Sequence, residues 1–159
     1  MTFLEKDLEQ IIFETPTEKL KEKGLVIKGK LLRQVKIGNY GIADLISFER
    51  NTSIDKDSEY FWQSIRITVY ELKQQKINLN AMAQAARYVS GIEKYLESRK
   101  MFFDIDYNIV LIGKDIEMNG DFVYLSDFIN NVRLTTYSYD VDGIRFENNS
   151  GYFLRDTGF

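Results

Sequence analysis

The clearest pattern along the chain is the alternation of residues 65–73, Ile-Arg-Ile-Thr-Val-Tyr-Glu-Leu-Lys. This stretch is rich in β-branched and aromatic residues and has no Gly or Pro, which predicts a β-strand. Because alternate side chains of a strand share a face, the apolar face of this strand ends in Glu71 and Lys73. A similar stretch, residues 40–48, predicts a neighbouring strand on which Asp44 lies between two isoleucines.

The remaining pattern predicts one α/β domain. Helical spacing of apolar residues indicates helices over residues 3–14 and over about 81–99, the second with Asn80 as its N-cap. Residues 49–63 are polar and predict a long hairpin loop. The other predicted strands are residues 25–37, residues 109–112, and a closing hairpin of residues 132–139 and 144–146. The expected order is helix, strand, strand, strand, helix, strand, and then a partly β tail.

Composition narrows the chemistry. The chain has 159 residues and 44% hydrophobic content, which suits a single globular domain. It has no Cys and no His, which excludes Ser-His and Cys-His nucleophilic sites and zinc sites built on these residues. A metal site in this chain must therefore use oxygen ligands, which suits Mg²⁺ or Mn²⁺. The net charge of −3 does not favour a broad polyanion-coating surface, although it leaves room for local basic groups.

Asp44, Glu71 and Lys73 together form a candidate catalytic group. Taken singly, each is an ordinary strand-end residue. In combination, two carboxylates on neighbouring strands can hold a divalent cation, and a Lys on the same face can orient a water or offset the charge of a phosphate. This is the arrangement that metal-dependent phosphodiester hydrolysis requires.

The predicted second helix adds polar side chains near this group. Gln84 and Tyr88 lie one helical turn apart, and Arg87 lies between them in sequence. Beside a metal site, Gln84 and Tyr88 are placed to hydrogen-bond a scissile phosphate or the catalytic Lys. The alternative is an exposed polar edge of the helix with Tyr88 half packed.

In this order, the motifs resemble the PD-(D/E)XK nuclease superfamily, and most of all the C-terminal nuclease domain of NucS/EndoMS-type mismatch and flap endonucleases. Glu5 followed by Ile-Phe-Glu-Thr-Pro at 12–16 is similar to that family's first helix, which ends in Phe-Glu-Asn-Pro. Gly-Ile-Ala-Asp at 41–44 is similar to its Gly-Ile-Val-Asp, and Val-Tyr-Glu-Leu-Lys at 69–73 to its Val-Leu-Glu-Leu-Lys. Residues 79–88 are similar to its Leu-x-Ala-Val-x-Gln-x-x-x-Tyr.

The resemblance covers residues 3–113 and implies a restriction-endonuclease-like αβββαβ core with a mixed central sheet flanked by helices. It implies that Asp44 and Glu71 are metal ligands and that Lys73 is the catalytic lysine. Glu5 would assist the metal or its waters, with Glu9, one turn further along the helix, as the alternative. Gln84 would lie near the phosphate, and Gln84, Arg87 and Tyr88 are the expected substrate contacts.

We therefore expect one nuclease-like domain over residues 1–159, with a β-rich C-terminal extension from about 120 to 159. The expected activity is hydrolysis of DNA by a metal-activated water, with Mg²⁺ or Mn²⁺ as cofactor. The alternative is a catalytically inactive module of the same fold that binds nucleic acid or protein. The family's N-terminal single-strand-binding domain has no counterpart in this sequence, so mismatch or flap specificity is not carried over.

The sequence also suggests a location and an assembly. The N-terminus is charged and no apolar run approaches the ~20 residues of a membrane span, so we expect a cytoplasmic protein with no membrane contact. A homodimer would give a small nuclease two sites across duplex DNA, whose symmetry it would match. The candidate contact surface holds the aromatic residues Tyr137, Tyr139 and Phe146.

Overall fold

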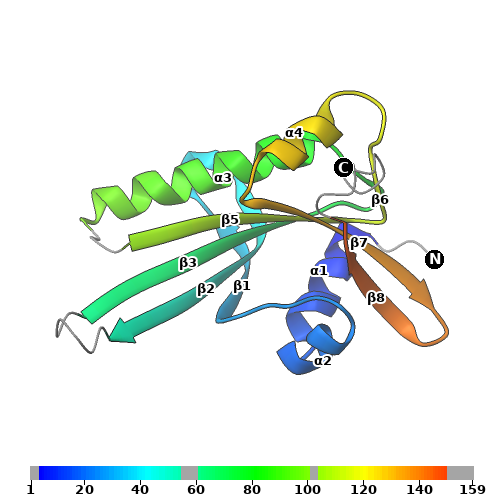
Figure 1. Ribbon diagram of the computed structural model, residues 1–159, viewed down its shortest axis with the longest axis horizontal. Coiled ribbons are helices and arrows are strands. Elements are labelled where there is room, and N and C mark those ends of the chain that lie inside the picture. Colours follow the sequence, from blue (N-terminus) through cyan, green and yellow to red (C-terminus); the bar gives the residue numbers. More distant parts are fainter. Residues whose placement is uncertain (1–3, 55–60, 101–103, 150–159) are drawn as a thin grey trace.

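A mixed six-stranded sheet lies at the centre of the chain, with helices on both of its faces (Figure 1). The computed structural model describes residues 4–54, 61–100 and 104–149. The helices are α1 (Glu5–Glu14), α2 (Thr17–Glu22), η1 (Gly38–Tyr40, a short 3-10 turn), α3 (Leu79–Ser98) and α4 (Phe122–Phe128). The strands are β1 (Lys30–Lys36), β2 (Ile42–Ile54), β3 (Phe61–Leu72), β4 (Lys76–Ile77), β5 (Asp104–Gly113), β6 (Asp115–Ile116), β7 (Val132–Asp140) and β8 (Gly143–Asn148).

The strand order of the large sheet is β1-β2-β3-β5-β7-β8. β1, β2 and β3 pair antiparallel, β5 pairs parallel with both β3 and β7, and β8 closes the sheet antiparallel to β7. A parallel neighbour needs a crossover connection, and α3 supplies it between β3 and β5. β4 and β6 form a separate short parallel pair. The predicted order of helix, three strands, helix and strand is confirmed.

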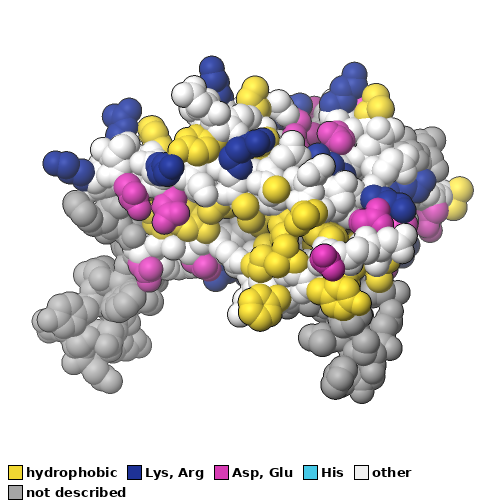
Figure 2. All heavy atoms as spheres, turned by 90° about the horizontal axis from the view of Figure 1, so that it is seen from above, with side chains coloured by type: hydrophobic (Ala, Val, Ile, Leu, Met, Phe, Trp, Pro, Cys, Tyr) yellow, Lys and Arg dark blue, Asp and Glu magenta, His cyan; other side chains and the backbone are white. Residues whose placement is uncertain are grey.

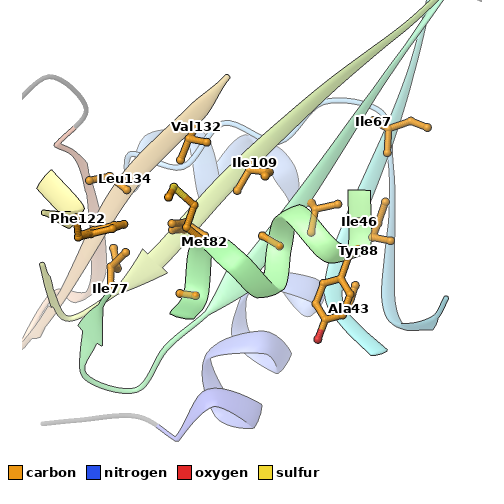
Figure 3. Close-up of a cluster of buried hydrophobic side chains, with 14 of the residues drawn as sticks. Ala43, Ile46, Ile67, Ile77, Met82, Tyr88, Ile109, Phe122, Val132 and Leu134 are labelled. Carbon is orange, nitrogen blue, oxygen red and sulfur yellow. The ribbon is translucent and has the colours of Figure 1, made fainter. Parts of the chain in front are cut away.

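Two hydrophobic clusters hold the layers together. The larger lies between the sheet and α3 with α4, and includes Ile46, Ile67, Ile109 and Met82 (Figure 3). The smaller lies on the opposite face, where Leu8, Ile12 and Leu20 of α1 and α2 cover Leu45, Leu72 and Ile112. Figure 1 shows α3 and α4 on one side of the sheet and α1 and α2 on the other. Within the described residues, no helix has both the length and the apolar character needed to cross a membrane.

Two local predictions are corrected by the structure. The side chain of Asn78, and not Asn80, caps α3, since its Oδ1 accepts a hydrogen bond from the Ala81 backbone N–H at 3.0 Å. The predicted loop of residues 49–63 is shorter, because β2 extends to Ile54 and β3 begins at Phe61. Residues 55–60 lie outside the described part of the chain.

The C-terminal extension joins the central sheet through β7 and β8. This changes the status of the aromatic residues proposed for a dimer contact. Tyr137 and Phe146 are buried in the cluster beneath α1 and α2, and of the three only Tyr139 is exposed. Tyr137 and Phe146 face inward from the β7–β8 hairpin and belong to the hydrophobic core, so the three aromatic residues do not form a contact surface.

Gly29 fixes the path of the chain into β1 and offers a test of this packing. It has a positive φ of 83°, and a Cβ added there would lie 2.0 Å from the Phe48 carbonyl oxygen. We expect Gly29→Ala to cost about 3 kcal/mol or more of unfolding free energy, because the backbone must move. Gly120→Ala is the matched control: its φ is 98°, but no atom lies within 4 Å of the added Cβ. It should cost only about 1–2 kcal/mol in a denaturant melt, and equal losses would contradict the close approach.

Candidate active site

The pairing of β2 with β3 brings Asp44 to Glu71. Leu45 pairs with Tyr70. One residue further along the same register, Asp44 lies opposite Glu71. Asp44 Oδ2 accepts a hydrogen bond of 3.0 Å from the backbone N–H of Leu72, the residue that follows Glu71. The two carboxylates therefore lie together where this strand pair ends.

Glu71 is the most perturbed acid of the site. Its residue is only 5% exposed, and its Oε2 has no hydrogen-bond partner among the described residues. Burial and then the negative charge of Asp44 raise the pKa of Glu71 to about 7, although Lys73 opposes this shift. A buried carboxylate oxygen without a donor is an expensive feature unless a cation or a proton meets it.

Asp44 shares this environment to a smaller degree. Burial raises the pKa of Asp44, and the negative charges of Glu5 and Glu9 act in the same direction. The Leu72 N–H and the charge of Lys73 act against them. Asp44 thus stands among three acidic groups, which indicates a local excess of negative charge.

Lys73 supplies the positive charge at the site. Its Nζ lies 3.4 Å from Glu71 Oε1 and donates a hydrogen bond of 2.9 Å to Gln84 Oε1 on α3. Its backbone N–H donates to the Ile112 carbonyl oxygen at 2.8 Å, which holds the end of β3 against β5. Four sequence-predicted residues, Asp44, Glu71, Lys73 and Gln84, are therefore brought together.

The first helix contributes two acids with different roles. Glu9 is buried and pairs with Arg33, whose Nε donates to its Oε1 at 2.9 Å, and Gln34 Nε2 donates to its other oxygen. Glu5 is exposed, and its charge raises the pKa of both Asp44 and Glu71. Glu5 is therefore the acid of α1 that faces the site openly, while Glu9 ties the helix to β1.

The remaining predicted residues divide between surface and core. Gln84 and Arg87 line an open hollow on the α3 side, together with Lys73, Asn78, Asn80 and Ala83. Tyr88 is 5% exposed, and its ring packs against Gly41 next to Ala43 (Figure 3). Burial gives Tyr88 a packing role, and its contact with a substrate stays a prediction. Arg87 is exposed, with its guanidinium carbon 5.8 Å from the centre of the Tyr88 ring.

The donor set fits a hard divalent cation held only in part by protein. The described residues contain no group of three or more acidic side chains placed to hold a metal ion. Mg²⁺ commonly binds through one or two carboxylates and keeps several waters. Asp44 and the unpartnered Oε2 of Glu71 meet that requirement, and Glu5 is available to hydrogen-bond waters.

Sequence reasoning missed Arg33 and Gln34, the partners of Glu9. The signal was weak: apolar alternation fails around these residues in β1, where Gln34 has a φ of +49°. A positive φ is uncommon outside glycine. In this structure, it accompanies the contact between Gln34 and the buried acid.

Comparisons of this chain with protein-family models, with curated proteins and with solved structures found no match. The resemblance to the PD-(D/E)XK superfamily therefore stays a prediction made from motifs.

Glu71 predicts a pH dependence of stability in metal-free buffer. Because its pKa is raised from 4.5 to about 7 on folding, the folded chain holds more protons than the unfolded chain between these values. Its contribution to stability is fully present below pH 4.5 and is lost as pH rises through about 7, at a cost of roughly 3 kcal/mol.

Denaturant melts across this range check the prediction. Glu71→Gln should remove most of the loss and be more stable than the parent at pH 8. Glu97→Gln, on the exposed surface of α3, is the control and should follow the parent. If the unfolding free energies of Glu71→Gln and the parent changed with pH in parallel, the raised pKa of Glu71 would be contradicted.

Proposed function

We propose that the chain is a Mg²⁺- or Mn²⁺-dependent nuclease that hydrolyses DNA, built on a restriction-endonuclease-like αβββαβ core. The order α1, β1, β2, β3, α3, β5 supports that core. The position of the acids supports it as well, since Asp44 and Glu71 come from two adjacent strands and Lys73 follows the second.

The observation that carries the proposal is the electrostatic imbalance at Glu71. Two carboxylates share a buried site, one of their oxygens has no donor, and the pKa of Glu71 is raised to about 7. A purely structural strand end would have no reason to keep this cost, whereas a divalent cation would offset it. Perturbed acids grouped in this way are typical of functional sites.

Each residue then has a task. Asp44 and Glu71 would hold the cation, which when bound supplies positive charge to a phosphate and lowers the pKa of a water. Lys73, held by Gln84 and Glu71, places an ammonium beside the carboxylates, where it stabilises the charge that develops on phosphate oxygens. Gln84 orients Lys73, and Arg87 on the rim of the same hollow offers a contact for the DNA backbone.

An apolar groove favours a second candidate, an inactive module that binds a protein. Leu79, Ala83 and Ala86 of α3 face Ile129 across this groove, and Phe128 beside it is 84% exposed. Figure 2 shows hydrophobic side chains gathered on the face that α3 and α4 cover, with Lys and Arg scattered over it. Such a surface suits protein binding better than DNA binding.

Lys73→Ala separates the two candidates. We expect cleavage of DNA to fall by about 10²-fold or more, because a charge that stabilises the transition state is lost. Binding should fall only modestly, since one of several cationic contacts is removed. The assay uses single-stranded, duplex, flap and mismatched DNA with Mg²⁺. Lys76→Ala is the control, since Lys76 is exposed and its Nζ lies 4.0 Å from Glu117 Oε2, whereas Lys73 is the lysine that contacts Glu71. No cleavage by the parent chain would favour the inactive module. Full activity in Lys73→Ala would contradict the catalytic role of Lys73.

Metal binding has its own test. Mg²⁺ should raise the unfolding free energy of the parent by roughly 1–3 kcal/mol when in large excess over its dissociation constant. Asp44→Asn should abolish this gain and be at least as stable as the parent without metal, because it removes a repelling charge while its amide oxygen still accepts from Leu72. A gain that persists in Asp44→Asn would place the metal elsewhere.

A further inference from the structure

Part of the sheet face that α1 and α2 share is left open by these helices. They cover Leu45, Leu72 and Ile112, and Figure 1 shows no helix below the other end of β2, β3 and β5. On this open part, the register aligns Ser47, Thr68 and Asn108 in one row across three adjacent strands. Tyr70, Val110 and Arg133 form the neighbouring row across β3, β5 and β7.

These rows form the floor of a hollow of about 240 Å³. Val26 and Lys28, in the segment that leads into β1, line it from the side. The hollow is smaller than the pockets of about 300–1,000 Å³ that take drug-sized ligands. Its size therefore suits a compact group.

The floor is polar yet buried, which is unusual for a sheet face left open to water. Ser47 is 3% exposed, Thr68 is 8% exposed and Tyr70 is 3% exposed. The Ser47 and Tyr70 hydroxyl oxygens lie 3.3 Å apart, so that these groups bond each other within the floor. A solvated strand face would instead expose such side chains.

One donor of the floor has no acceptor. Asn108 Nδ2 is buried and makes no hydrogen bond with any described residue. A buried polar atom without a partner is costly, and native proteins keep few of them. Its position in the lining of the hollow indicates an acceptor that belongs to a ligand.

The charge of the hollow is positive once internal ion pairs are removed. Arg66 is paired with Asp106 at 3.1 Å and lies 4.0 Å from Glu49, which also lines the hollow, so these two acids more than balance the charge of Arg66. Lys28 and Arg133 have no ion-pair partner within the described part of the chain. Arg133 and Glu49 both line the hollow beside Tyr70. Burial raises the pKa of Tyr70, the charge of Glu49 adds to this shift, and the charge of Arg133 opposes it.

We propose that this hollow binds a phosphate group, either free inorganic phosphate or the monoester of a mononucleotide. Arg133 and Lys28 would neutralise its charge, and Asn108 Nδ2 with the hydroxyls of Ser47 and Thr68 would donate to its oxygens. A carboxylate has only two oxygens to receive these donors, whereas phosphate has up to four. The site is separate from Asp44 and Glu71 and does not depend on the proposed nuclease activity.

Amide chemical shifts and calorimetry test the proposal with the full chain. Titration with inorganic phosphate, and separately with a 5′-mononucleotide, should shift the amides of Ser47, Thr68, Asn108 and Arg133 in a saturable way. Tighter binding of the nucleotide would identify the monoester as the ligand, and equal binding would identify phosphate itself; both outcomes support the site.

Variants make the test specific. Arg133→Gln is a surface change and should weaken binding by about tenfold or more, since a guanidinium contact to phosphate is lost. Asn108→Asp should abolish binding by replacing a donor with a repelling carboxylate, and a melt checks that it folds. Arg145→Gln, an exposed cation of β8 paired with Asp142 at 3.8 Å, is the control and should bind as the parent does.

Glu71→Gln should also bind phosphate normally, which keeps this result distinct from that of the nuclease. The proposal is overturned if neither ligand gives saturable shifts or if Arg133→Gln binds like the parent. Shifts that map to Lys73 and Gln84 instead, or that appear only with DNA oligomers, would also overturn it.

Discussion

The antiparallel pairing of β2 with β3 is the constraint on which both proposed sites depend. It runs from Leu45 opposite Tyr70 to Ile54 opposite Phe61, and it fixes the face of every side chain on two strands. One face carries Ile67 and Val69 toward α3 and ends in Glu71, while the other presents Thr68 and Tyr70. A slip of one residue would exchange the faces, placing polar side chains in the core and separating the residues of both proposed sites.

Burial and mutual repulsion of Asp44 and Glu71 cost folding free energy, and the packing of the surrounding core offsets this cost. Leu72 and Val69, the neighbours of Glu71 on β3, are fully buried, and Leu72 also donates its backbone N–H to Asp44. The strand therefore cannot move the acids apart without breaking its packing. Under the proposed function, a rigid strand pair that holds repelling charges together would be a preorganised cation site.

Features that depend on strand alternation or helical spacing could be predicted from the sequence. Features that depend on contacts between distant segments could not. Alternation was enough to place Glu71 and Lys73 on one face, and helical spacing was enough to find α3. Asn80 is the predicted cap because it directly precedes a helix expected from Ala81, whereas α3 begins at Leu79 and Asn78 caps it. The turn before β2 covers Tyr88, and the addition of β7 and β8 to the sheet buries Tyr137 and Phe146. The pattern of residues along the chain carries no information about these contacts. The pair of Glu9 with Arg33 spans 24 residues and has no local signature.

That pair assigns different roles to the two acids of α1. Glu9 is buried and held by Arg33 and Gln34, and the positive φ of Gln34 is local strain of the kind that persists where contacts around it are strong. This anchorage fixes the helix on β1 and so fixes Glu5, one turn earlier, near Asp44 and Glu71. A carboxylate that is already bonded to a guanidinium has little capacity left for a cation, whereas an exposed one can bond its waters. For the proposed metal site, the structure thus favours Glu5 over Glu9 as the assisting acid, and Glu9 sets the position of Glu5.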